Sequence, residues 1–128
     1  MKQGLTAVFL ILAISTNAVA DNSLLTKQFS LCMDNSGGVT AAMLDCVTTE
    51  TAIQDARLNS AYRKLRGQLS DARKAQLLAT QRIWIQFRDA NCGFYADPEG
   101  GTMAAVSGSD CVLQATASRA KELERFLE

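Results

Sequence analysis

Residues 55–92 decide the fold, and they read DARLNSAYRKLRGQLSDARKAQLLATQRIWIQFRDANC. Largely apolar side chains recur there in two sets, at spacings of three and four residues, as on one face of an amphipathic α-helix. The first set is Leu58, Tyr62, Leu65 and Leu69, and the second is Leu77, Gln81, Trp84, Arg88 and Cys92. Between the sets, Gly67 weakens the first helix and Ser70 is a good N-cap for the second. The pattern predicts an αα-hairpin with a short connection, whose two faces meet.

The face of the second helix is not purely apolar, because Gln81 and Arg88 lie on it. A buried guanidinium needs a partner, and its planar fork suits a carboxylate. Asp55 and Asp45, on the preceding helix, are the candidates for this partner. We expect a polar network that fixes helix register, with Asp55, Asn59, Gln81 and Arg88 as its members. The alternative is an exposed recognition or catalytic cluster.

Two motifs in this stretch resemble a known family. The first is Asp-x-x-Leu-Asn-x-x-Tyr, at Asp55, Leu58, Asn59 and Tyr62. The second is Gln-x-x-Trp-x-x-x-Arg-Asp-x-x-Cys, at Gln81, Trp84, Arg88, Asp89 and Cys92. Together they resemble the lysozyme-inhibitor LprI-like family of bacterial secreted proteins, over about Cys32 to Leu127. The family pattern also places an arginine near Arg119. The resemblance implies an exported helical binding protein that inhibits a lysozyme-type muramidase.

The first twenty residues predict a secretory signal peptide. Lys2 supplies the positive start, residues 5–14 form a short apolar core, and Ala18-Val19-Ala20 is a small-residue cleavage site. Cleavage after Ala20 leaves residues 21–128 as a single domain, in the periplasm or secreted. The apolar run is too short to span a bilayer and no second run follows, so we expect no membrane span in the mature form.

All four cysteines lie in the expected mature part: Cys32, Cys46, Cys92 and Cys111. An exported chain meets an oxidising compartment, so an even number of cysteines predicts two disulfides. Four cysteines allow three pairings, and local closure favours Cys32–Cys46 with Cys92–Cys111. Each would close a loop on the order of 15–20 residues, worth roughly 3 kcal/mol if the stabilisation is entropic.

The remaining segments are also expected to be helical. A short helix carries Leu24, Leu25, Phe29 and Met33 after a cap at Asn22-Ser23, and a long helix opens at Val39 or Thr40 and runs into the hairpin. The second helix of the hairpin should end near Cys92-Gly93. Residues 97–101 are irregular, and a last helix starts at a Thr102 cap, with Gly108-Ser109 as its breaking point. The fold class is all-α: a helical hairpin, a third long helix packed across it, a short N-terminal helix and disulfide staples.

The composition argues against an enzyme. The chain has no histidine, which removes Ser/His and Cys/His pairs and the commonest metal ligand. Oxidised cysteines are not nucleophiles, and no glycine-rich phosphate loop is present. Acid pairs such as Asp89 with Asp97 are interpreted as solvated surface groups. We expect no catalytic residue, no metal and no cofactor.

Charge is unevenly distributed along the chain. Thirteen basic residues balance thirteen acidic ones, but residues 57–88 hold eight bases and a single acid. The end of the hairpin is therefore a candidate binding surface, formed by Arg63, Lys64, Arg66, Arg73 and Lys74. Nucleic acid is not expected as a partner, because the chain is exported and no aromatic residues are interleaved with these bases. The apolar side chains Leu77, Trp84, Ile85 and Phe87 are expected in the core.

Two functions remain open. An inhibitor would place an ordered element into a cleft lined by two carboxylates, and the basic hairpin end suits such a cleft better than the acidic segment 97–102. Docking through the acidic flanks stays open, because a large part of a typical lysozyme surface is basic. The alternative is an envelope interaction or stress adaptor with no enzyme target, bound to an anionic envelope component.

Overall fold

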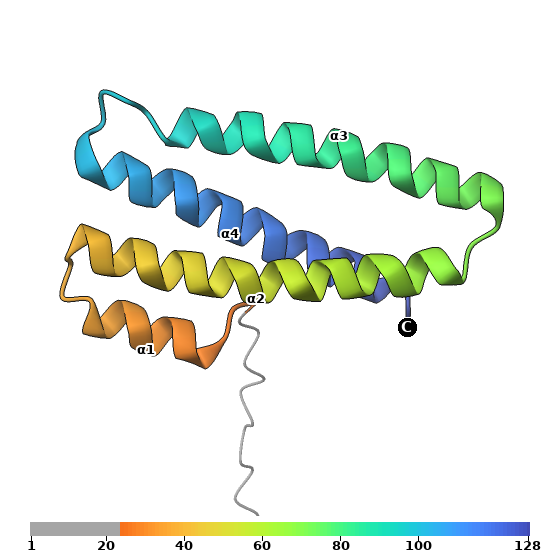
Figure 1. The fold of residues 1–128 in the computed structure, drawn as a ribbon, viewed down its shortest axis with the longest axis horizontal. Coiled ribbons are helices and arrows are strands. Elements are labelled where there is room, and N and C mark those ends of the chain that lie inside the picture. The colour runs from red at the N-terminus through yellow and green to blue at the C-terminus, as the bar shows by residue number, and fades with distance from the viewer. Residues whose placement is uncertain (1–23) are drawn as a thin grey trace, which may run out of the picture.

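The computed structural model describes residues 24–128, which form four α-helices and no strand. They are α1 (Lys27–Asn35), α2 (Thr40–Gly67), α3 (Asp71–Tyr95) and α4 (Gly101–Arg125). Figure 1 shows α4 between α2 and α3, with α1 against α2. This arrangement confirms the expected all-α class. The expected signal peptide, its cleavage after Ala20 and the cap at Asn22-Ser23 fall outside the described residues.

The two long faces of the hairpin do not meet directly. α4 packs extensively against α2 and also against α3, and it separates the two arms of the hairpin along most of their length (Figure 1). The arms come together near the connecting turn, where Leu69 and Leu77 pack on a cluster that contains Leu65 and Leu123. The expectation of direct contact between the faces was wrong because each face is covered by α4 instead.

The core lies along α4. Leu113, Ala117, Ala120 and Leu123 are almost fully buried, and they recur at spacings of three and four residues. The opposing residues of α2 are as regular: Val47, Leu58, Ala61 and Leu65 are also buried. Alanines at these positions let the two helices approach closely, so α2 and α4 form the main packing layer.

Both expected disulfides are confirmed. Cys32–Cys46 ties α1 to the start of α2. Cys92–Cys111 ties the end of α3 to the middle of α4, where their Cα atoms are 5.4 Å apart. The second bond helps to hold α3 on α4, because few residues of α3 are buried.

The helix ends follow the sequence signals with four exceptions. Val39 and Ser70 precede α2 and α3 as expected. α1 begins at Lys27 with Thr26 as its cap, so placing Leu24 and Leu25 in this helix was wrong. The side chain of Thr26 accepts a hydrogen bond from the Phe29 amide. The cap of α4 is Gly100 rather than Thr102. α3 continues past Gly93 to Tyr95, and α4 runs through Gly108 without a break.

α3 is more exposed than its sequence suggests. Among its residues, Gln81 and Cys92 are the buried ones, and Trp84 is half-buried. Phe87 is 65% exposed and Ile85 is 39% exposed, so placing them in the core was wrong. One face of α3 meets α4, and the rest of the helix has no covering element within the described part of the chain.

Candidate functional site

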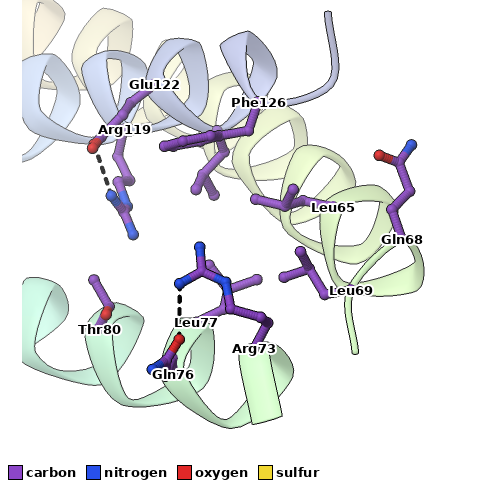
Figure 2. Close-up of a pocket in the computed structure, with 11 residues that line it drawn as sticks. Leu65, Gln68, Leu69, Arg73, Gln76, Leu77, Thr80, Arg119, Glu122 and Phe126 are labelled. Carbon is purple, nitrogen blue, oxygen red and sulfur yellow. Dashed lines mark hydrogen bonds and ion pairs between the residues drawn. The ribbon is translucent and has the colours of Figure 1, made fainter. Parts of the chain in front are cut away.

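A hollow of about 340 Å³ opens where α2 turns into α3, and the end of α4 forms its third side (Figure 2). Its apolar lining is Leu65, Leu69, Leu77, Leu123 and Phe126. Its polar lining is Gln68, Arg73, Gln76, Thr80, Arg119 and Glu122. Apolar walls with a few polar groups are typical of sites that receive a small molecule or a protruding side chain. The hollow and its rim are therefore the candidate site.

Arg119 is the buried cation beside this hollow. Its side chain is 7% exposed, and its Nε donates a hydrogen bond to the Oε1 of Gln81 at 3.1 Å. Its NH1 donates to the Oε2 of Glu122 at 2.7 Å. The guanidinium carbon also lies 5.9 Å from the centre of the Trp84 ring. Arg119 thus joins α4 to α3 through an amide, a carboxylate and an aromatic ring.

Arg88 occupies a different position from the one expected. Its side chain is 19% exposed, and it pairs with the neighbouring Asp89 at 2.8 Å. It also donates to the Thr116 hydroxyl at 3.5 Å and lies over the Trp84 ring, 5.2 Å from its centre. The expected pairing with Asp55 or Asp45 was wrong, because α4 lies between α2 and this part of α3.

The four residues of the expected network are separated into two groups. Asp55 and Asn59 are exposed on α2 and hydrogen-bond to each other at 3.0 Å. Gln81 is buried, but its partner is Arg119 rather than Arg88. The sequence therefore identified the right polar position on α3 but the wrong cation. Arg119 could have been found from the family pattern, which places an arginine there.

The expected basic residues do gather at the hairpin end. Arg63 and Arg66 are exposed and have no ion pair or hydrogen bond from their side chains within residues 24–128. Arg73 points into the hollow and donates to Gln76 at 2.8 Å (Figure 2). Lys74 pairs with Asp71 at 3.1 Å. The fifth residue of the set, Lys64, lies in the last turn of α2.

The hairpin end is not purely cationic, because the C-terminal part of α4 folds back to it. Glu122 lines the hollow, and Glu124 lies against Arg57 and near Lys64. The acidic flank of the sequence thus adjoins the basic segment in space. Among the described residues, Arg63 and Arg66 are cations of this end with neither an ion pair nor a side-chain hydrogen bond, and Arg73 adds a charge that is bonded only to the neutral Gln76.

The segment 97–102 lies at the opposite end of α4. The Oδ1 of Asp97 accepts a hydrogen bond from the Glu99 amide at 2.9 Å, which orders the turn before α4. Gly101 has φ of 70°, a left-handed conformation that suits glycine. Residues 97–102 are exposed and carry two acids, Asp97 and Glu99.

A second polar cluster, which the sequence did not indicate, joins three helices. Glu50 is 2% exposed and accepts hydrogen bonds from the amide and hydroxyl of Thr26 and from the amide of Gln54. Burial alone would raise the pKa of Glu50, but these hydrogen bonds outweigh it and the net pKa is lowered. The polar run around Glu50 in the sequence gave no sign of its partner, because Thr26 lies on another element.

Arg57 and Glu124 extend this cluster to α4. The Nε and NH2 of Arg57 donate to the two carboxylate oxygens of Glu124 at 2.6 and 2.5 Å. This bidentate geometry is the strong form of an arginine–carboxylate pair. The hydrogen bond with Glu124 raises the pKa of Arg57, and the same bond lowers that of Glu124. The cluster therefore acts as a structural clamp between α1, α2 and α4.

Within residues 24–128, no three His, Cys, Asp or Glu side chains lie close enough together to hold a metal ion. None of the helices in the same range has the length and apolar character needed to cross a membrane. Fold and site together define a small disulfide-stapled helical scaffold with a polar-rimmed hollow.

Comparison with known proteins identifies the family. Residues 32–123 match the family model described as lysozyme inhibitor LprI. The match covers most of the chain, including both disulfides and the cluster around Arg119, so the chain belongs to this family. No curated protein and no solved structure matches the chain.

Proposed function

We propose that this chain is an exported inhibitor of a lysozyme-type muramidase. The observation that carries the proposal is the family match over residues 32–123. The two disulfides support it, because they suit a protein that works in an oxidising compartment. The signal peptide expected at residues 1–20 would take the chain there. The protein acts by binding and is not an enzyme.

The proposed contact surface is the hairpin end. Glycoside hydrolases of this type use a pair of carboxylates in a cleft, and a guanidinium can pair with a carboxylate in two parallel hydrogen bonds. Arg63 and Arg66 have no side-chain partner in the described part of the chain, so they can form such pairs without breaking an internal contact. The adjacent hollow can receive a side chain from the rim of the cleft.

Rigidity supports binding at this end. Leu65, Leu69 and Leu77 hold the turn against α4, so the hairpin end is ordered before it meets a partner. A preordered surface loses less conformational entropy on association, which increases affinity for a given contact area.

The test is a titration of lysozyme activity on a cell-wall substrate with purified, oxidised protein. We expect activity to fall in proportion to the protein added, up to one equivalent. The same protein, reduced and alkylated, is the control, because it lacks the two staples. Unchanged lysozyme activity in a large molar excess of oxidised protein would overturn the proposal and leave an envelope adaptor as the function.

A further inference from the structure

α3 carries an apolar stripe that no other helix of the described part covers. Ile83, Phe87 and Phe94 are 66%, 65% and 85% exposed, and Ala90 completes the row. Their spacings of four, three and four residues align them along the helix, which has about 3.6 residues per turn. At that pitch the stripe lies about a third of a turn from the face that packs on α4. A monomeric protein seldom leaves such a continuous apolar surface in water.

The flank around the stripe contains no charged residue. Its members are Gln76, Ala79, Thr80, Ile83, Gln86, Phe87, Ala90 and Phe94. A strongly charged partner would lose hydration here and gain no ion pair in return. The flank therefore suits a partner whose own surface is apolar and uncharged at the centre.

A positive and a negative side chain at one edge of this flank indicate that the partner is a second copy of the chain. Arg82 and Asp89 lie two helical turns apart on the same edge, at equal distances from the bond between Ile85 and Gln86. Both are exposed, and the side chain of Arg82 has no ion pair or hydrogen bond within residues 24–128. Asp89 uses Oδ1 for Arg88 and keeps Oδ2 available. The charges on this edge are therefore complementary to those of an antiparallel copy of the same helix.

We propose that two copies of the chain associate through this stripe, with their α3 helices antiparallel about a two-fold axis between Ile85 and Gln86. In a two-fold interface the same edge of each helix meets its counterpart, so the charge contact forms twice. Arg82 of each copy then lies level with Asp89 of the other. Phe87 lies close to the axis and interleaves with its own counterpart, and Ala90 leaves room for close approach.

Little conformational entropy would be lost when such an interface forms, because α3 is already held in place. The Cys92–Cys111 disulfide and the contacts of Gln81 and Trp84 already fix α3 on α4, so dimerisation need not order the helix. The proposal does not rest on inhibition of lysozyme. The apolar row from Ile83 to Phe94 also lies outside the hollow, so both surfaces can be occupied at once.

The first test measures the mass of the oxidised protein by light scattering over a concentration series. We expect the mass to double as concentration rises. Phe87→Glu should abolish the doubling, because it places a charge at the centre of the stripe. Phe126→Glu is the matched control: Phe126 is 64% exposed, close to the 65% of Phe87, but lies at the hollow. A single-copy mass at every concentration, or doubling that survives Phe87→Glu, would overturn the proposal.

The second test uses the symmetry of the charge contact. Arg82→Asp should set like charges against each other twice and raise the dissociation constant about tenfold, and Asp89→Arg should do the same. The double variant exchanges the two charges and should restore the affinity. Thermal melting checks that each variant is folded, since Asp89→Arg also removes the contact with Arg88. Failure of the double variant to restore association would exclude the antiparallel register proposed here.

Discussion

At the scale of single residues, Arg119 organises the contact between α3 and α4. It is the buried cation of the described core, and it has an amide, a carboxylate and an aromatic ring as partners. Each partner comes from a defined place: Gln81 and Trp84 from α3, and Glu122 from the next turn of α4. A buried charge is tolerated when its donors are satisfied in this way.

Arg119→Ala should destabilise the protein by about 2–3 kcal/mol, because it leaves the buried Gln81 amide without its partner and opens a cavity beside Trp84. Arg88→Ala is the matched control. Arg88 pairs with an exposed carboxylate and makes a long hydrogen bond of 3.5 Å to the buried Thr116, so its loss should cost less than that of Arg119, about 1 kcal/mol. Urea unfolding of both variants measures the difference. Equal losses would show that the two arginines are interchangeable supports of the Trp84 ring.

The sequence alone did not indicate which of Arg88 and Arg119 is buried. Arg88 lies on the apolar face of its own helix by spacing, and it was therefore taken as the buried one. Arg119 lies on another helix, and which arginine becomes buried depends on how closely α4 approaches α3. That distance is set by packing between segments far apart in the chain, which local periodicity does not encode.

Glu50 should make stability depend on acid pH. Although burial alone would raise it, hydrogen bonds from Thr26 and Gln54 hold the pKa of Glu50 below the ordinary glutamate range in the folded protein. Its contribution to stability is therefore complete above the ordinary pKa and is lost as pH falls through the lower folded pKa. Glu50→Gln removes this titration and should cost about 1 kcal/mol near neutral pH. The unfolding free energies of the two proteins should then converge as pH falls below the ordinary glutamate pKa of about 4.3. Parallel curves over this range would show that Glu50 does not titrate differently on folding.

At the scale of elements, the end of α3 lies unusually close to α4. A Cβ atom on Gly108 would lie 2.5 Å from the Cβ of Ala96 and 3.1 Å from its Cα. A glycine in this helix was expected to break it, but the residue is needed for the close approach of the two helices. The disulfide Cys92–Cys111 sits beside this contact and holds the same two elements together.

Gly108→Ala should therefore destabilise the protein by roughly 1–3 kcal/mol through overpacking. Gly93→Ala is the control, because nothing lies within 4 Å of its added Cβ and alanine favours a helix by up to about 1 kcal/mol. Thermal melting should give a lower midpoint for the first variant and an equal or higher midpoint for the second. If both variants melt above the parent protein, α3 and α4 can separate at this point without loss.

The sequence predicted that the four helices exist, but it predicted only in part how they pack. The spacings of three and four residues predicted the two arms of the hairpin, cap and turn residues predicted the first and last helices, and local loop closure predicted both disulfides. The exposure of α3 was not foreseen, because apolar residues such as Ile85 and Phe87 look the same in the sequence whether they face a core or water. Whether an apolar stripe is exposed or buried depends on which other helix packs over it, and this is decided by the tertiary structure.

At the scale of the whole molecule, the chain presents two different ends. The hairpin end has the hollow and the unpaired Arg63 and Arg66, and the opposite end has the acidic segment 97–102. The C-terminal carboxylates Glu122 and Glu124 are paired with arginines, so they offset the charge of the hairpin end without covering its exposed cations.

If the hairpin end engages an acidic cleft, charge reversal at Arg66 and Arg73 should weaken inhibition of lysozyme. Both residues lie outside the core, so helicity and the melting midpoint should stay unchanged. Association should also slow with added salt, because exposed charges are screened beyond about 8 Å at physiological ionic strength. Alanine at Asp97 and Glu99 is the contrast, with little effect or a small gain expected. Loss of inhibition in the segment variant, with inhibition intact in the charge-reversed one, would move the contact to the opposite end of the molecule.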